Sequence, residues 1–382
     1  VLLVGLMAIS LGSISAADST QFERVRERLR QQLERPNPDG TPRISKQFRR
    51  WEWFWQGRLR EDGSFPTPDM YMNELNKLRA AKPTDDPQAP KTWRELGPIA
   101  PDLPGESASW DGIGRVNVIE FSRQNPAHFW AGSASGGVWR STNSGGSWQW
   151  VNIPIVPVLG VSDIAISPKD DKLIYVATGD VNAAGDGNSL GYPAFTYGLI
   201  KSTDGGSTWN TTGLMFDVSQ QSLISRLFID PTNTDIIVAA TYSGIRRSTD
   251  GGATWRMSVN GQFRDMIAHP TNSNILYAST WAPVGGSAVF RSTDNGVTWE
   301  NMFSVSSANR IRLSVTKATP NVVALVASNA QTNGLDGVYK STDAAESFLE
   351  LPTSLNLLGW SSNGGGTGGQ GFYDLAMEIS PT

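Results

Sequence analysis

Apolar residues recur along this chain with two different spacings. From residue 21 to about residue 81 they lie three and four positions apart, which is the spacing of one helix face. Thr67–Asp69 is a typical start for the last helix of this region. We therefore expect helices and a proline-rich linker over residues 18–91. The two clearest apolar stripes are Phe22, Val25, Leu29 and Leu33, and Ile44, Phe48, Trp51, Trp55 and Leu59.

After Trp93 the pattern changes to short apolar strands separated by turns. A strand such as Ile164–Ser167 ends at a proline turn, and a strand rich in Val, Ile, Tyr and Ala follows, as in Lys172–Thr178. A variable loop and a third strand come next, and an aromatic residue opens a fourth. Four antiparallel strands in each short repeat form the blade of a β-propeller, an all-β fold. Residues 92–382 are therefore predicted to hold about five blades and the start of a sixth.

One short motif marks the turn between the third and fourth strands. It consists of a basic residue, Ser-Thr, Asp or Asn, a glycine-rich turn and an aromatic residue. Five copies occur at intervals of 44 to 61 residues, and a repeat of this length is typical of propellers. The copies begin at Ser141, Ser202, Ser248, Ser292 and Ser341.

The motif has a direct physical explanation and is similar to the Asp-box, or BNR, repeat. An inward carboxylate can accept several backbone N–H groups, and glycine supplies the positive φ angles of a tight turn. We expect the aromatic ring to pack over the turn, between neighbouring blades. The last copy has Ala344 and Ala345 in place of glycine, so we expect a looser turn there. This structural role is assigned to Asn143, Trp148, Asp204, Trp209, Asp250, Trp255, Asp294, Trp299, Asp343 and Phe348.

Composition limits the chemistry of the chain. Its 382 residues include 39 Gly, 22 Pro and 14 Trp, which suits short strands and tight turns. The absence of cysteine excludes disulfides, thiolate catalysis and cysteine-bound zinc, and only two histidines are present. The formal net charge of −4 gives no reason to expect a nucleic-acid partner. We predict no cofactor and no metal ligands, with a structural calcium ion as the one exception considered below.

Residues 1–17 are interpreted as a signal peptide whose first residues are missing. Val1–Leu11 is almost wholly apolar, and the small residues Ser15 and Ala17 fit cleavage after Ala17. The apolar stretch is too short to span a bilayer, so no transmembrane segment is expected after cleavage. A buried N-terminal strand is the alternative. The prediction is a secreted or cell-surface protein.

Ligand binding is predicted on the face opposite the Asp boxes. In a four-stranded blade, the turns after strands one and three share one face, and the other connections share the opposite face. The longest loop of that opposite face is Gly179–Tyr197, whose rings and carboxylates suit a sugar. A calcium ion held by Asn182, Asp186 and Asn188 is one alternative, and a loop that merely bridges two strands is another. The candidate ligand-binding residues are Asp180, Asp186, Tyr192, Phe195, Trp281, Asp336 and Trp360.

Charged residues stand at the starts of the innermost strands, and their sign alternates along the chain. We expect them to form ion pairs around the mouth of the axial channel, which are weak individually if exposed. The predicted ring consists of Arg115, Asp163, Arg226, Asp265, Arg312 and Asp374.

The chain resembles exported BNR-repeat proteins of Bacteroidetes-type bacteria, which are grouped with the sortilin N-terminal propeller. The resemblance rests on the Asp boxes, on Arg50–Trp55 with Gly63–Pro66, and on Gly369–Asp374. It implies a propeller of seven to ten blades, often followed by a C-terminal secretion-sorting domain.

Two enzyme families share the repeat. Sialidases carry an Arg-Ile-Pro or Arg-Leu-Pro motif ahead of the first box, and neither occurs here. Xyloglucanase-like hydrolases place a catalytic aspartate in a Thr-Asp-x-Gly-Gly segment, and the matching stretch, Ser133–Gly137, has Ala134 at that position. Since glycoside hydrolysis needs two carboxylates at a defined separation, the resemblance does not support a catalytic pair.

These observations favour an exported propeller that serves as a binding scaffold for a glycan or a protein ligand at the cell surface. One alternative is a divergent glycoside hydrolase, sialidase- or xyloglucanase-related, with Asp180, Asp186 or Asp336 as its acids. A structural adhesion protein is the other. Glycan binding without release of reducing sugar would separate the scaffold from the hydrolase.

Overall fold

The computed structural model describes residues 20–33, 35–36, 42–43, 46–80, 115–156, 160–182, 196–220, 222–283, 285–361, 363–373 and 375–380. The chain divides into two compact units, Val1–Pro66 and Thr67–Thr382. The predicted signal peptide and the predicted boundary between residues 91 and 92 both lie outside the described residues.

The first unit is a small helical unit with an aromatic core. It contains α1 (Gln21–Leu33), β1 (Arg35–Pro36), β2 (Pro42–Arg43) and α2 (Lys46–Gln56). Trp51 stacks on Phe22 with ring centroids 5.4 Å apart, and Trp55 meets Phe65 edge-on at 4.9 Å. These two tryptophans are therefore buried by residues of their own unit, whereas Trp53 is 72% exposed.

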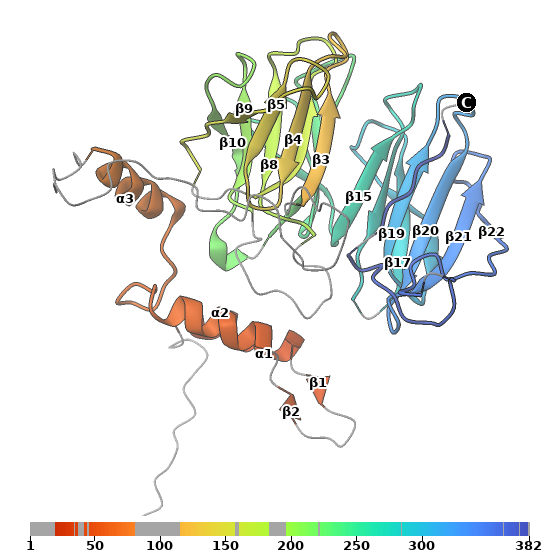
Figure 1. The fold of residues 1–382 in the computed structure, drawn as a ribbon, viewed down its shortest axis with the longest axis horizontal. Coiled ribbons are helices and arrows are strands. Elements are labelled where there is room, and N and C mark those ends of the chain that lie inside the picture. The colour runs from red at the N-terminus through yellow and green to blue at the C-terminus, as the bar shows by residue number, and fades with distance from the viewer. Residues whose placement is uncertain are drawn as a thin grey trace, which may run out of the picture. The chain divides into compact units, whose positions relative to one another are not determined.

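The second unit contains five four-stranded antiparallel sheets, each with its strands adjacent in chain order (Figure 1). Blade one holds β3 (Val116–Phe121), β4 (Phe129–Ser133), β5 (Val138–Ser141) and β6 (Gln149–Val151). Blade two holds β7 (Val161–Ile166), β8 (Ile174–Thr178), β9 (Gly198–Ser202) and β10 (Asn210–Met215). Blade three holds β11 (Ile224–Ile229), β12 (Ile237–Thr241), β13 (Gly244–Ser248) and β14 (Arg256–Val259). Blade four holds β15 (Phe263–Ala268), β16 (Leu276–Thr280), β17 (Ser287–Ser292) and β18 (Glu300–Val305). Blade five holds β19 (Ala308–Val315), β20 (Val323–Asn329), β21 (Leu335–Ser341) and β22 (Leu349–Leu351). Outside the blades this unit also contains α3 (Pro68–Ala80) and the short 3₁₀ helix η1 (Val218–Gln220).

The first strands of the blades lie next to one another. The contacts join β3 to β7, β7 to β11, β11 to β15 and β15 to β19. This is the arrangement of blades around a common axis. The segment 375–380 continues the series beside β19, since Ile379 N donates to Ser314 Oγ at 2.9 Å and Thr316 Oγ1 donates to Ser380 O at 3.0 Å. The predicted all-β propeller of five blades and the start of a sixth is confirmed.

The second strands are buried on both faces because each sheet is covered by a neighbouring blade on either side. Every residue of β8 and of β12 is buried. Such strands have continuous apolar runs rather than an alternating pattern, and small residues such as Ala239 and Ala240 let the sheets pack closely. The core is therefore a series of clusters between blades rather than a single centre.

The Asp box forms the turn that its chemistry predicts. Asp294 Oδ1 accepts the backbone N–H groups of Val297 and Thr298 at 3.1 and 2.9 Å, and Oδ2 accepts the Thr298 hydroxyl at 2.5 Å. Asn143 of the first box keeps the main contact, because its Oδ1 accepts Ser147 N at 2.8 Å while its Nδ2 donates to Ser147 Oγ at 2.9 Å. The hydroxyl four positions later is the main reason why the pKa is about 2 for three box carboxylates, Asp204, Asp250 and Asp343.

The last box is not looser than the others, which corrects the sequence-based expectation. Ala344 and Ala345 have φ angles of 58° and 69°, close to the 66° and 88° of Gly251 and Gly252 in the third box. The hydrogen bond from Ala345 N to the first serine of its box is 2.8 Å long, and the equivalent bond from Gly252 N is 2.9 Å. The turn keeps its shape because the serine and the carboxylate hold it. The two alanines therefore adopt a left-handed conformation in spite of its steric cost.

The tryptophans that close the boxes lie over their own turns. The indole N–H donates to the carbonyl of the second turn glycine: Trp209 to Gly206, Trp255 to Gly252 and Trp299 to Gly296, at 3.2, 2.9 and 3.3 Å. Trp209 is buried in the cluster that joins blades one and two. Trp148 of the first box remains 37% exposed.

The basic residue of the motif connects each blade to the next one. In four consecutive blades it donates to the backbone carbonyl of the first positive-φ residue in the following Asp box. The pairs are Arg140 to Gly205 O (3.1 Å), Lys201 to Gly251 O (3.2 Å), Arg247 to Asn295 O (2.8 Å) and Arg291 to Ala344 O (3.0 Å). We call this contact the blade clamp. It explains why a basic residue belongs to the repeat.

Replacing Arg247 with methionine is expected to lower the free energy of unfolding by about 1–3 kcal/mol, since a charged donor to a half-buried carbonyl is lost. Arg256→Met is the control, because Arg256 is an exposed residue in the same blade. Urea unfolding of both variants provides the measurement. Equal effects of the two substitutions would show that the clamp adds nothing.

Ala344→Gly is expected to raise the free energy of unfolding by about 0.5–1 kcal/mol, since glycine adopts a positive φ without the steric cost of a Cβ. The matched control is Ala253→Gly in the third box, where φ is not positive and the change should be destabilising by about 0.5 kcal/mol. Thermal unfolding compares the two variants. A destabilised Ala344→Gly protein would contradict the strain argument.

Candidate ligand-binding face

The two faces of the propeller are separated by hydrogen bonds within the blades. On the first face each box contacts the turn after strand one of its own blade, as in Asn295 N to Asn274 O at 2.8 Å. On the opposite face the turn after strand two contacts the connection from the preceding blade, as in Tyr242 N to Leu223 O at 3.0 Å. Gly179 N donates to Gly160 O at 2.8 Å in the same way. The loop that begins at Gly179 therefore leaves from the face opposite the Asp boxes, which we call the loop face.

The described structure includes only part of the predicted site. Asp186, Tyr192, Phe195 and Asp374 lie outside the described residues, as does Asn188 of the calcium alternative. Four candidate ligand-binding residues are described, namely Asp180, Trp281, Asp336 and Trp360.

Asp180 is occupied by contacts within the protein. Its side chain is buried, its Oδ2 pairs with Arg115 Nη2, and its Oδ1 accepts Asn117 Nδ2 at 3.0 Å. Asp336 is similarly engaged, because its two carboxylate oxygens accept Ser307 Oγ at 3.0 Å and Asn329 Nδ2 at 2.8 Å. Neither carboxylate is a free acid that points into solvent.

The two candidate tryptophans lie in opposite environments. Trp281 is 6% exposed and stacks on Tyr242, with ring centroids 5.4 Å apart. Trp360 is 72% exposed. Its loop is held in place because Asn356 Nδ2 donates to Gly366 O and Gly368 O, both at 3.1 Å. Only Trp360 offers an open ring face to a ligand.

Four of the predicted ring residues form a continuous series of ion pairs at the channel. The contacts are Arg226 Nη1 to Asp163 Oδ1 at 3.3 Å, Arg226 Nε to Asp265 Oδ1 at 3.0 Å and Arg312 Nη1 to Asp265 Oδ1 at 2.8 Å. Burial acts to raise the pKa of Asp265, but Arg312 and Arg226 together hold it below its ordinary value. The two carboxylates are buried and the two arginines are half-buried, so the pairs replace solvation that the carboxylates have lost.

Strand register changes one member of the predicted ring. Asp163, Arg226 and Asp265 each follow the bulge near the start of the first strand. Counted along the ladder from the box serine, Arg312 is the equivalent residue in blade five, and the bulge there lies two residues earlier. In blade one the equivalent residue is Val118, and Arg115 precedes the strand and pairs with Asp180 instead. Sequence reasoning could not place this member, because a bulge shifts the register without changing the apolar pattern.

Sequence reasoning also missed a carboxyl group in the axial channel. The channel has a volume of about 770 Å³ and is lined by the first strands, including Glu120 of β3. Burial raises the pKa of Glu120 to about 7, and the nearby Asp163 carboxylate acts in the same direction. The alternation of β3 could have indicated that Glu120 points inward.

A smaller pocket opens at the channel mouth on the loop face. Its volume is about 180 Å³, and Arg264, Arg310, Arg312 and Asn182 are among its lining residues. Arg264 and Arg310 are only 3% and 6% exposed. The sequence could have indicated both arginines, because Arg264 directly precedes Asp265 and Arg310 lies two residues before Arg312, at strand starts where the charged ring was predicted.

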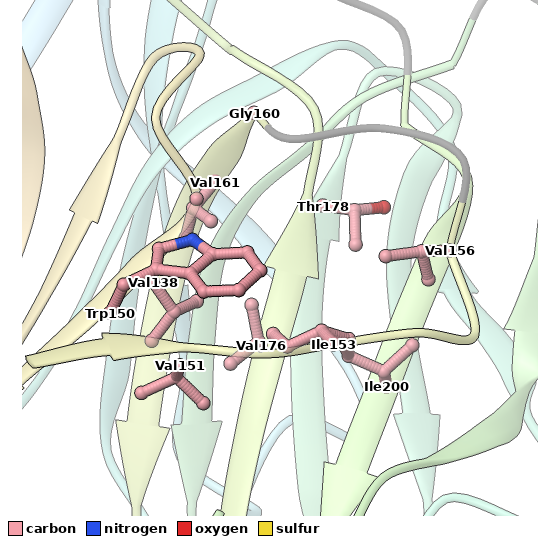
Figure 2. A pocket seen from close by; sticks show the side chains of 11 residues that line it. Val138, Trp150, Val151, Ile153, Val156, Gly160, Val161, Val176, Thr178 and Ile200 are labelled. Carbon is pink, nitrogen blue, oxygen red and sulfur yellow. The ribbon is translucent and has the colours of Figure 1, made fainter. Parts of the chain in front are cut away.

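A third space lies between blades one and two and is too small for a ligand. Figure 2 shows the Trp150 indole above apolar side chains that include Val138, Val176 and Ile200. Its volume is about 30 Å³, which is close to the space of one water molecule in the liquid. We interpret it as a gap in the packing between blades.

Two further observations bear on metals and membranes. The described part of the chain contains no group of three or more His, Asp or Glu residues placed to hold a metal ion. Among the helices that the structure describes, none has the length and apolar character needed to cross a membrane.

Comparison with known proteins points to carbohydrate-acting relatives. No family model matches the chain. A xyloglucanase of Paenibacillus sp is 26% identical over 289 residues, which cover 70% of this chain and 23% of the relative. A xyloglucanase of Hypocrea jecorina is 27% identical over 201 residues, which cover 50% of this chain and 20% of the relative. The chain therefore spans less than a quarter of the length of these curated relatives.

Solved structures with a similar fold include two GH74 enzymes. The GH74 xyloglucanase from Xanthomonas campestris has a TM-score of 0.49 and 16% identity, covering 66% of this chain and 39% of that chain. The Niastella koreensis GH74 enzyme has a TM-score of 0.48 and 18% identity, covering 62% and 38%. From its sheets and its sequence relatives, the chain is a β-propeller related at low identity to xyloglucanases. The assignment to sortilin-like BNR proteins stays a prediction.

Glu120→Gln is expected to remove one source of pH dependence in stability. Because the pKa of this carboxyl is about 7 in the folded protein and 4.5 ordinarily, its protonated form favours folding. The free energy of unfolding of the parent protein should therefore fall as the pH rises from about 4.5 to about 7. The variant should match the parent at pH 4 and be more stable at pH 8.

Urea unfolding at pH 4, 6 and 8 measures this difference, with Glu300→Gln as the control because Glu300 is exposed. A constant difference between parent and Glu120→Gln across this range would contradict the predicted linkage.

Proposed function

We propose that this chain is a carbohydrate-binding β-propeller that holds a glycan on its loop face. The observation that carries the proposal is Trp360, an indole that is 72% exposed on a loop fixed by hydrogen bonds. An exposed ring on a well-fixed loop provides apolar area at low entropic cost, which suits the C–H face of a pyranose. The low-identity relationship to xyloglucanases supports a glycan as the ligand.

The engagement of Asp180 and Asp336, the two candidate acids that the structure describes, favours binding over hydrolysis. Asp180 holds Arg115, and Asp336 accepts two side-chain donors of its own blade. A glycosidase needs one carboxyl group that can give up a proton and a second that can attack or activate water. Ala134 occupies the position at which the resemblance to xyloglucanase-like hydrolases would place an acid. An extracellular location is part of the proposal and is supported by the apolar segment Val1–Leu11.

Trp360→Ala is expected to weaken glycan binding about tenfold or more, because a central aromatic anchor contributes a large share of the binding free energy. Calorimetric titration with xyloglucan oligosaccharides and a panel of neutral and acidic oligosaccharides measures the effect. The control is Trp53→Ala, since Trp53 is also 72% exposed but lies in the helical unit. Equal affinities for both variants would overturn the assignment of Trp360.

Hydrolysis is the second candidate function, and the relationship to xyloglucanases favours it. If the chain only binds, no reducing sugar is released from xyloglucan by the parent protein or by Asp180→Asn. Release that is abolished in a folded Asp180→Asn protein would replace the binding proposal with an enzymatic one. Circular dichroism verifies that the variant is folded, since the substitution also weakens the pair with Arg115.

A further inference from the structure

Two buried arginines at the channel mouth have no carboxylate partner among the described residues. Arg264 lies in β15 and Arg310 in β19, and both line the pocket of about 180 Å³ on the loop face. The ring arginines that line the same pocket are paired with carboxylates, since Arg226 contacts Asp163 and Asp265 and Arg312 contacts Asp265. Burial of a charge without a partner is costly, so the unpaired arginines need a separate explanation.

Arg264 is the less satisfied of the two. Its Nη2 donates to Asn182 Oδ1 at 3.4 Å, while Nε and Nη1 are buried without a hydrogen-bond partner. Its guanidinium lies 5.7 Å from the centre of the Trp281 ring. The Trp281 indole nitrogen and the Tyr242 hydroxyl are buried and unpartnered as well. Several N–H and O–H donors are thus collected here without acceptors.

Arg310 adds a second positive charge to the same pocket. Its Nη1 donates to the carbonyls of Phe372 and Tyr373 at 2.8 and 3.0 Å, and its Nη2 shares Asn182 Oδ1 at 3.5 Å. Burial, with Arg264 and Arg312 nearby, lowers the pKa of Arg310 well below its ordinary value. No Asp or Glu is among the described residues that line the pocket.

The fold itself does not require an arginine at position 264. This residue is the bulge residue of the first strand, and the same position is Ser162 in blade two and Ser225 in blade three. At this position the Ser225 hydroxyl donates to Ala240 O at 3.0 Å and to Phe263 O at 2.9 Å. A small neutral side chain is therefore sufficient for the strand, and the buried charge of Arg264 serves another purpose.

We propose that this pocket is an anion site that takes the carboxylate of an acidic sugar residue. Two guanidinium groups that face one small pocket match a carboxylate, which accepts paired N–H donors. The pocket is tied to the proposed glycan platform, because Asn309, next to Arg310, donates to Asn333 Oδ1 at 2.9 Å, and Asn333 O accepts Gly371 N at 2.8 Å in the loop of Trp360. The choice of a sugar as carrier rests on the proposed function, whereas the anion site itself does not.

The test is calorimetric titration of the full chain with sodium D-glucuronate, with D-glucose and inorganic phosphate as comparison ligands. Glucuronate should bind the parent protein, glucose should not bind at this pocket, and Arg264→Ser should bind glucuronate at least tenfold more weakly. Arg256→Ser is the control, because it removes one exposed positive charge from β14. It should bind as the parent does.

Arg264→Ser should fold with an unchanged or raised melting temperature, since serine occupies the same position in blades two and three. Arg264→Gln provides a second variant of similar length if the serine variant unfolds. In the parent protein, glucuronate should raise the melting temperature, and in either variant this rise should be lost.

The outcomes separate this inference from the proposed function. Glucuronate that binds equally to the parent and both Arg264 variants, or not at all, overturns the anion site, even if Trp360-dependent glycan binding persists. Phosphate binding without glucuronate binding overturns the carboxylate assignment. Glucuronate binding that depends on Arg264, in a protein whose Trp360→Ala variant binds glycans normally, supports the anion site and removes the proposed platform.

Discussion

The contact on which the propeller depends is the blade clamp, in which a basic side chain of one blade donates to a backbone carbonyl in the next Asp box. The box carboxylate and serine hold that turn in its own blade, so the carbonyl lies at a fixed place. The clamp then fixes the turn to the preceding blade, as Arg247 does to Asn295 at 2.8 Å. Turn shape and blade spacing are thus set by the same short motif. The first strands converge as a consequence, and the channel charges meet.

Burial of charge at the hub has two different outcomes. The first outcome is pairing, in which attraction between opposite charges compensates for the solvation lost on burial. It applies to Asp163, Arg226, Asp265 and Arg312. Arg264 keeps two unpaired nitrogen atoms at a similar depth. The first set joins blades two to five at the hub, and Arg264 brings positive charge to the pocket on the loop face. The ion-pair series and the proposed recognition pocket are therefore formed by neighbouring residues of the same strands.

The two faces of the propeller also differ in whether their polar groups are paired within the protein. On the box face the polar atoms of Asp294 and its equivalents are used within the turn. On the loop face Trp360 remains open to solvent, and two buried nitrogen atoms of Arg264 have no hydrogen-bond partner among the described residues. A relationship to xyloglucanases at 26–27% identity agrees with the proposed recognition of a glycan on this face, although Asp180 and Asp336 are used in the scaffold.

The sequence by itself determined the blades, the Asp-box turns and which loops share a face, because each of these depends on residues within a few positions of one another. It predicted both Trp360 and Trp281 on the loop face, but it could not distinguish the open ring of Trp360 from that of Trp281, which Tyr242 covers. Only the tertiary structure decided that Asp180 pairs with Arg115, 65 residues away, and that two nitrogen atoms of Arg264 have no hydrogen-bond partner among the described residues. Such partners belong to different blades, and their distance depends on how blades pack around the axis and on strand bulges, neither of which an apolar pattern records.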